Sequence, residues 1–251
     1  MTLDGTNTYL YGSDPCVVID PGPDDAGHLG AVREAAEGRG GIGVVLLTHS
    51  HGDHADGAEP LATAVEARGG VRPPVVLPAG DEERGGDLQH WSEHGSGGLP
   101  VGEGRHGLRA LATPGHAADH VCLFTDDGVC FAGDLVLGEG STFVPPDGGS
   151  LAAYMDSLRA VQAEAPELIC PGHGPWIIDP AAKLAEYVEH REMRERRLLA
   201  ALDRGERSRG ALLAEVWDDA PAEVRPAAAL VMEAHLQKLA AENRLPGGIT
   251  E

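Results

Sequence analysis

The chain has 251 residues, enough for one large domain or for a large domain with a small one, and 42% of them are hydrophobic. No stretch approaches the roughly 20 consecutive apolar residues of a membrane-spanning helix, and residues 1–5 lack the basic start and apolar core of a secretory signal. The net charge is −21, and residues 1–180 hold 27 acidic side chains against 8 basic ones. This acidity disfavours binding to nucleic acid, whose affinity comes largely from Lys and Arg contacts with phosphates.

The four cysteines stand singly in apolar surroundings, and none of them forms a C-x-x-C pair. We therefore expect buried thiols in a reducing cytoplasm rather than disulfides or metal ligands. The sequence is rich in Ala, Gly, Asp, Glu and Arg and has few Lys residues, which favours a bacterial source with a GC-rich genome.

Apolar runs and turn residues predict short strands and helices along the first half of the chain. Strands are expected at 8–11, 16–20, 43–48 and 75–77, and helices at 26–37 and 53–67. Residues 79–107 are rich in Gly, Asp and Glu and lack a clear period, which predicts a loop over a pocket mouth. Its larger side chains are His90, Trp91, His94 and His106. We expect these side chains to be solvated, and contact with substrate is the alternative.

Further strands are predicted at 108–112, 121–125, 129–132 and 168–170, with a helix at 151–164. The last 70 residues then change character. Pro180 opens a long charged helix, Ser208 caps a short one that ends at Trp217, and residues 222–242 form a third.

The most informative segment is the run Thr-His-Ser-His-Gly-Asp-His at 48–54, which directly follows the apolar residues 44–47. Three imidazoles and a carboxylate within six positions are hard to explain as packing, and these are ligands for Zn and related metals. Three later strands are each followed by a Gly-containing turn and one ligand-type side chain, namely His116, Asp134 and His173. Loops at strand ends are where catalytic groups collect, so we expect a two-metal site.

This ligand pattern resembles that of the metallo-β-lactamase superfamily over nearly the first 180 residues. The resemblance implies an α+β fold, an αββα sandwich over residues 1–180, followed by a small helical, winged-helix-like domain over 181–251. It further implies that His49, His51 and His116 hold one metal, that Asp53, His54 and His173 hold the second, and that Asp134 bridges the two. The expected cofactors are two Zn ions, with Mn or Fe as alternatives.

Four further stretches resemble the β-lactamase-like protein 2 branch of that superfamily, at residues 3–10, 138–142, 171–175 and 190–195. Members of the branch usually have a strand before the first stretch, so either that strand is absent here or the true start lies upstream of Met1. Functions in the branch include single-stranded RNA endonucleases and thioesterases that release acyl chains from carrier proteins.

Several site residues are expected beyond the metal ligands. In the family the free oxygen of Asp53 is placed to accept the nucleophile's proton, so we assign Asp53 a catalytic role. His120 is expected to lie next to the metal ligands and to orient one of them through a hydrogen bond, with a surface position as the alternative. The Gly-rich stretch 138–143 is expected to line the substrate pocket through Gly138, Ser141 and Thr142, with a plain connection as the alternative.

The function expected from these observations is a hydrolase in which a metal-bridging hydroxide attacks a thioester or other acyl bond, on a small or carrier-bound substrate. RNA phosphodiester cleavage at the same site is the alternative. Redox chemistry is disfavoured, because the flavin-linked di-iron relatives have Glu where this chain has His51, and sulfur dioxygenases do not use the second ligand set. A binding module with structural metals is also disfavoured, since structural zinc sites are closed. The nearly neutral C-terminal region favours packing over nucleic-acid contact and is compatible with a homodimer.

Overall fold

The computed structural model describes residues 5–78, 89–90 and 107–250. The first part of the chain forms a five-stranded sheet in the order β1-β2-β3-β4-β5. Its strands are β1 (Tyr9–Tyr11), β2 (Cys16–Ile19), β3 (Ile42–Leu46), β4 (Val75–Leu77) and β5 (Gln89–His90). Only β1 runs antiparallel to its neighbour, and the other pairs are parallel.

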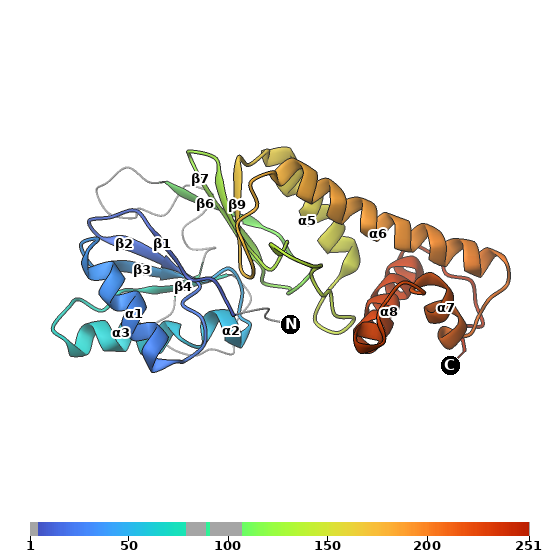
Figure 1. Ribbon diagram of the computed structural model, residues 1–251, viewed down its shortest axis with the longest axis horizontal. Coiled ribbons are helices and arrows are strands. Elements are labelled where there is room, and N and C mark those ends of the chain that lie inside the picture. The colour runs from blue at the N-terminus through green and yellow to red at the C-terminus, as the bar shows by residue number, and fades with distance from the viewer. Residues whose placement is uncertain (1–4, 79–88, 91–106, 251) are drawn as a thin grey trace.

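Helices α1 (Ala26–Glu37), α2 (Gly52–Ala55) and α3 (Ala58–Ala67) accompany this sheet (Figure 1). The single helix predicted at 53–67 is wrong, because the chain breaks it at Asp56 and Gly57. The Gly57 backbone N–H donates to the Gly22 carbonyl oxygen at 2.9 Å rather than to the helix ladder. A Cβ on residue 57 would lie 2.9 Å from the same carbonyl oxygen, so the close approach to this turn also requires glycine.

A second sheet of four strands follows, in the order β6-β7-β8-β9. These strands are β6 (Leu108–Ala112), β7 (Val121–Thr125), β8 (Val129–Gly133) and β9 (Leu168–Pro171). Pairing is antiparallel from β6 to β8 and parallel between β8 and β9. Helix α5 (Leu151–Glu164) connects the last two strands and covers the outer face of the sheet (Figure 1).

The two sheets pack face to face between helical layers, and strand alternation explains the layering. In β2, Cys16 and Val18 join the cluster with α1 and α3, whereas Val17 and Ile19 join the cluster between the sheets. Because successive side chains point to opposite faces, a strand buried on both sides reads as a continuous apolar run. The expected sandwich of two mixed sheets inside helices is confirmed.

The remaining chain is helical, with α6 (Pro180–Asp203), α7 (Arg209–Val216), a 3-10 turn η1 (Ala222–Val224) and α8 (Arg225–Ala241). The first half of α6 packs on the sandwich through Leu184 and Tyr187. Its second half forms a separate cluster with α7 and α8. Helix α6 therefore belongs to both cores, as its position along both parts of the molecule in Figure 1 illustrates.

Three helices after residue 180 match the prediction, but a winged-helix arrangement is not confirmed. Within residues 181–250 the β pairing is limited to an isolated bridge between Ser208 and Thr250. All four cysteines are buried and free, as expected. No helix in the described ranges combines the length and apolarity needed to cross a membrane.

Candidate metal centre

The side chains expected to bind metal lie just beyond strand ends of both sheets. Strand β3 ends at Leu46 and is followed by residues 48–54, the ligand run, within which helix α2 begins. His116 follows β6, and Asp134 and His173 follow β8 and β9. Four segments far apart in sequence thus meet at one edge of the sandwich.

Three imidazoles form the first group of potential ligands. His51 Nδ1 lies 3.0 Å from His49 Nε2 and 3.0 Å from His116 Nε2. All three nitrogens lie within 4.8 Å of one another. Nitrogen atoms that converge at this spacing can share one cation.

The second group consists of Asp53, His54 and His173, again within 4.8 Å. The Nε2 atoms of His54 and His173 are 3.3 Å apart. Asp53 Oδ2 lies 3.3 Å from His173 Nε2 and 3.9 Å from His54 Nε2. One carboxylate oxygen and two imidazole nitrogens therefore converge on a second point.

Asp134 lies between the two groups. Its Oδ1 is 3.3 Å from His173 Nε2 and 3.4 Å from His54 Nε2, while its Oδ2 is 3.5 Å from His116 Nε2. Oδ1 is buried and makes no hydrogen bond. A buried carboxylate oxygen without a partner is costly in a folded protein, whereas a cation shared with the neighbouring imidazoles would satisfy it.

The electrostatics of the cluster also favour an added cation. Burial by itself would lower the pKa of His54, but the carboxylates of Asp20 and Asp134 outweigh it and raise that pKa to about 10. Burial is likewise outweighed at His173, where Asp134 and Asp53 raise the pKa to about 9. Carboxylates that attract a proton to these nitrogens attract a metal cation for the same reason.

His49 has the opposite tendency. Its burial and the nearby His54 hold the pKa of His49 well below its usual value. A neutral imidazole keeps a free lone pair on Nε2. The hydrogen bond between His49 Nδ1 and the Thr48 hydroxyl leaves that lone pair directed at the cluster.

Asp20, at the end of β2, holds the ligand run in place. Its Oδ1 accepts from the Thr48 backbone N–H at 2.8 Å, and its Oδ2 accepts from the Thr48 hydroxyl at 2.7 Å. The same Oδ2 lies 2.9 Å from His54 Nδ1, so His54 donates there and presents Nε2 to the cluster. Asp20 and Thr48 were not among the site residues expected from sequence. The strand-ending Asp20-Pro21-Gly22 turn was the available signal.

Backbone carbonyls orient two further ligands. His116 Nδ1 lies 2.7 Å from the Phe143 oxygen, and His173 Nδ1 lies 2.9 Å from the Gly5 oxygen. Each Nδ1–H donates outward and leaves Nε2 as the ligand atom. His120 is fully buried behind the cluster, where its Nε2 accepts from the Asp134 backbone N–H at 3.1 Å.

The Gly-rich stretch 138–143 packs against the cluster. The Gly138 N–H donates to the His173 carbonyl oxygen at 2.9 Å. The Thr142 hydroxyl donates to the Leu135 carbonyl oxygen at 3.2 Å, and Arg191 of α6 donates to the Ser141 hydroxyl at 3.1 Å. These contacts fix the stretch beside the ligands, and its role in lining a substrate pocket stays a prediction.

Gly172 lets the β9 loop pass directly behind the ligands. A Cβ at this position would lie 2.6 Å from Asp134 Oδ1 and 2.7 Å from His54 Cε1. Residue 172 therefore has to be glycine for the carboxylate and the imidazole to keep their positions.

The cluster opens to solvent at His51 and Asp53. His51 is exposed, and the Asp53 side chain is 33% exposed against 12% for Asp134. The remaining ligand imidazoles are buried. Seven donors around two convergence points with one open side fit two divalent cations and leave room for a small third group. Trp91, His94, His106 and the side chain of His90 lie outside the described residues.

Comparison with known proteins agrees with this geometry. The family model for the metallo-beta-lactamase superfamily matches residues 1–173. A beta-lactamase-like protein 2 homolog from Drosophila melanogaster is 34% identical over 98% of this chain and 85% of its own length. An atrochrysone carboxyl ACP thioesterase from Aspergillus fumigatus is 34% identical over 83% of this chain and 63% of its own length.

Solved structures show the same fold. A metallo-beta-lactamase family protein from Thermus thermophilus aligns with a TM-score of 0.71 at 23% identity, covering 97% of this chain and 91% of that chain. The family match over most of the sandwich and the near full-length relative lead to one conclusion. The chain belongs to the metallo-beta-lactamase superfamily.

Proposed function

We propose that this protein is a dinuclear metal-dependent hydrolase that cleaves a thioester or another acyl ester-like bond. The observation that carries the proposal is the position of Asp134, whose buried Oδ1 makes no hydrogen bond and lies between His54 and His173. In this proposal His49, His51 and His116 would hold one ion, Asp53, His54 and His173 would hold the other, and Asp134 would contribute an oxygen to each.

The donor set supports zinc, which takes imidazole and carboxylate ligands, and Mn or Fe are the alternatives. Two such ions would lower the pKa of a shared water and polarise the oxygen of a bound acyl group. The chain's own contribution is to fix four of the ligand imidazoles in place through Asp20, Thr48 and backbone carbonyls, namely those of His49, His54, His116 and His173.

Asp53 is the proposed proton acceptor. The neighbouring His173, whose Nε2 lies 3.3 Å from Asp53 Oδ2, keeps the pKa of Asp53 below its usual value despite partial burial, so the carboxylate is ionised at neutral pH. It is also the ligand carboxylate with the larger exposed fraction, and a substrate that enters from solvent meets it first. A proton taken up at a carboxylate oxygen of Asp53 could then leave through the open side of the site.

Two observations favour an acyl substrate over RNA. Residues 1–180, which hold the whole ligand set, carry 27 acidic and 8 basic side chains, and this acidity repels a polyphosphate chain. One relative with 34% identity is named as a thioesterase acting on an acyl carrier protein. We extend that substrate class, but not its particular acyl group, to this protein.

The test is to assay the zinc-loaded full chain against a panel of acyl thioesters and, in parallel, a labelled single-stranded RNA. We expect thioester turnover with inert RNA. His54→Ala should abolish turnover, because it removes a ligand and the partner of Asp20, while Asp24→Asn in an exposed turn should leave it unchanged. RNA cleavage that vanishes in His54→Ala would show that the substrate is a phosphodiester rather than an acyl compound. The absence of metal-dependent hydrolysis of both substrates would refute the proposal.

A further inference from the structure

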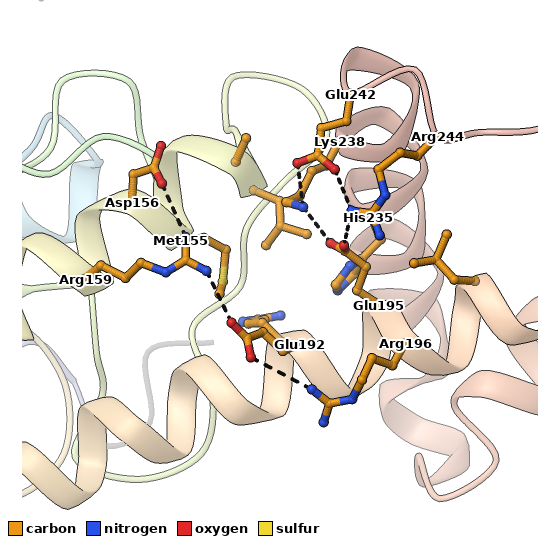
Figure 2. A pocket seen from close by; sticks show the side chains of 14 residues that line it. Met155, Asp156, Arg159, Glu192, Glu195, Arg196, His235, Lys238, Glu242 and Arg244 are labelled. Carbon is orange, nitrogen blue, oxygen red and sulfur yellow. Dashed lines mark hydrogen bonds and ion pairs between the residues drawn. The ribbon is translucent and has the colours of Figure 1, made fainter.

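A cavity lies between helices α5, α6 and α8, lined by residues that serve none of the proposed metal-binding roles (Figure 2). Its volume is about 420 Å³, within the range of sites that bind small organic ligands. Leu151, Ala152, Met155 and Leu199 form the apolar part of the wall, and His235 and charged side chains form the rest. The cavity is thus built from two helices of the C-terminal region and one helix of the sandwich.

Most of the charges around this cavity neutralise one another. Glu195 lies 2.7 Å from Lys238 and 2.8 Å from Arg244, and Glu242 bridges the same two cations at 2.7 and 2.8 Å. Figure 2 shows this network on one side of the cavity and a second network on the other side. The second network consists of Asp156, Arg159, Glu192 and Arg196.

Arg191 is the exception among the lining cations. Its side chain is buried, and it makes no ion pair within the described residues. The guanidinium donates to the Ser141 hydroxyl and to the Thr142 carbonyl oxygen and stacks 5.5 Å from the centre of the Tyr154 ring. Its Nε–H is buried and has no hydrogen-bond partner. A buried guanidinium with only neutral partners and a spare donor leaves one positive charge unmatched.

His235 of α8 lines the same cavity and also has unused hydrogen-bonding groups. The residue is 1% exposed, and neither Nδ1 nor Nε2 makes a hydrogen bond. Burial, followed by the charge of Arg191, lowers the pKa of His235 to about 3, so the ring is neutral at pH 7 and carries one N–H donor. Buried imidazoles normally find a partner. The His235 ring N–H and the Arg191 Nε–H both lack an acceptor and belong to residues that line one cavity, which indicates a missing acceptor there.

We propose that the α5–α6–α8 cavity binds a small organic carboxylate, with its oxygens accepting from Arg191 Nε and a His235 ring N–H and its hydrocarbon part against Leu151, Met155 and Leu199. A carboxylate offers two acceptor oxygens and a single negative charge. That charge matches the one unpaired lining cation, whereas a phosphate monoester would bring nearly a second charge toward Glu192 and Glu195. The inference does not depend on the proposed reaction, since binding is measured without turnover.

The experiment is isothermal titration of the zinc-loaded full chain with sodium hexanoate, hexanamide and inorganic phosphate. We expect saturable one-to-one binding of hexanoate, and much weaker binding of hexanamide and phosphate. His235→Phe should lower hexanoate affinity about tenfold, the effect of losing one hydrogen bond to a charged group. This variant should fold, because the nitrogens it removes make no hydrogen bonds.

Two further variants keep the test independent of the stability of any one mutant. Leu199→Trp, from a partly buried lining position, should fill the cavity and abolish binding. Arg225→Met, at an exposed arginine outside the cavity, is a control for substitution in α8 and should bind as the parent does. No hexanoate binding, preferential binding of phosphate, or equal hexanoate affinity in His235→Phe and the parent protein would each overturn the proposal. So would binding that survives in Leu199→Trp but is lost in His54→Ala, because it would place the carboxylate at the metal centre.

Discussion

Replacing Asp20 by Asn tests how the sandwich prepares its metal ligands. The carboxylate accepts three hydrogen bonds, two from Thr48 and one from His54 Nδ1, and the residue is 2% exposed. An Asn amide has one acceptor oxygen and one donor NH₂. In one orientation the NH₂ faces the Thr48 N–H. In the other orientation the NH₂ faces His54 Nδ1. The His54 ring must then carry its proton on Nε2, the nitrogen that is expected to bind metal.

The expected size of the effect follows from these contacts. Changing the hydrogen-bond partner of a ligating histidine typically lowers metal affinity by about 10- to 100-fold, or about 1.4 to 2.7 kcal/mol. The loss should be greater for the ion held by His54 than for the ion held by His49, which Asp20 reaches only through Thr48. We also expect Asp20→Asn to lower the free energy of unfolding by about 1.5 to 3 kcal/mol, the contribution of one hydrogen bond to a charged group.

The assay is a competition titration of zinc against a chelator, with metal content measured after each step, for the parent chain, Asp20→Asn and the exposed control Asp24→Asn. The control should release both ions at the same chelator concentrations as the parent. Asp20→Asn should release its first ion at clearly lower chelator concentration. If Asp20→Asn binds two ions with unchanged affinity, then His54 does not depend on Asp20 for its tautomer and the reasoning is wrong.

Three other outcomes are expected. Gly172→Ala should lower zinc content and thermal stability together, because its Cβ would come within 2.6 Å of Asp134 Oδ1; a variant with full zinc content by elemental analysis would contradict this. Asp53→Ala should bind one ion fewer and lose turnover while keeping its circular dichroism spectrum, since Asp53 is partly exposed; normal turnover would remove its catalytic role. The pKa of His235 is about 3 in the folded chain against about 6.5 when unfolded, so the unfolded state takes up the proton first and stability is lost as pH falls below about 6.5. His235→Phe should reduce that loss by about 1.4 kcal/mol per pH unit in denaturant titrations between pH 6 and pH 4, and equal slopes would show that His235 is protonated in the folded state.

Much of the fold was readable in the sequence because local patterns dominate there. The helix at 26–37 and the strands at 75–77, 108–112 and 121–125 have the predicted bounds, since apolar periodicity and turn residues set them directly. The helix break before Ala58 was not readable, because it depends on a hydrogen bond between Gly57 and the distant Gly22 carbonyl.

The candidate ligands were also readable, because metal chemistry restricts which side chains can serve and the first four of them lie within six residues. Residues that position a ligand without binding metal are not restricted in this way to particular side chains. Asp20 looked like part of a turn, and only the pairing of β2 with β3 places its carboxylate against His54 and Thr48.

No pattern in the sequence predicts the α5–α6–α8 cavity. Arg191 lies in the stretch 190–195 that resembles the branch, but that resemblance assigns Arg191 no role, and His235 fits an ordinary amphipathic helix. Their shared environment exists only because α8 folds back beside α5 and α6, which buries both side chains without giving Arg191 Nε or His235 a partner. Sequence determined the order of elements and the side chains available for metal binding, since both follow from local residue chemistry. Tertiary structure decided which polar atoms are left without partners, because that depends on segments brought together from across the chain.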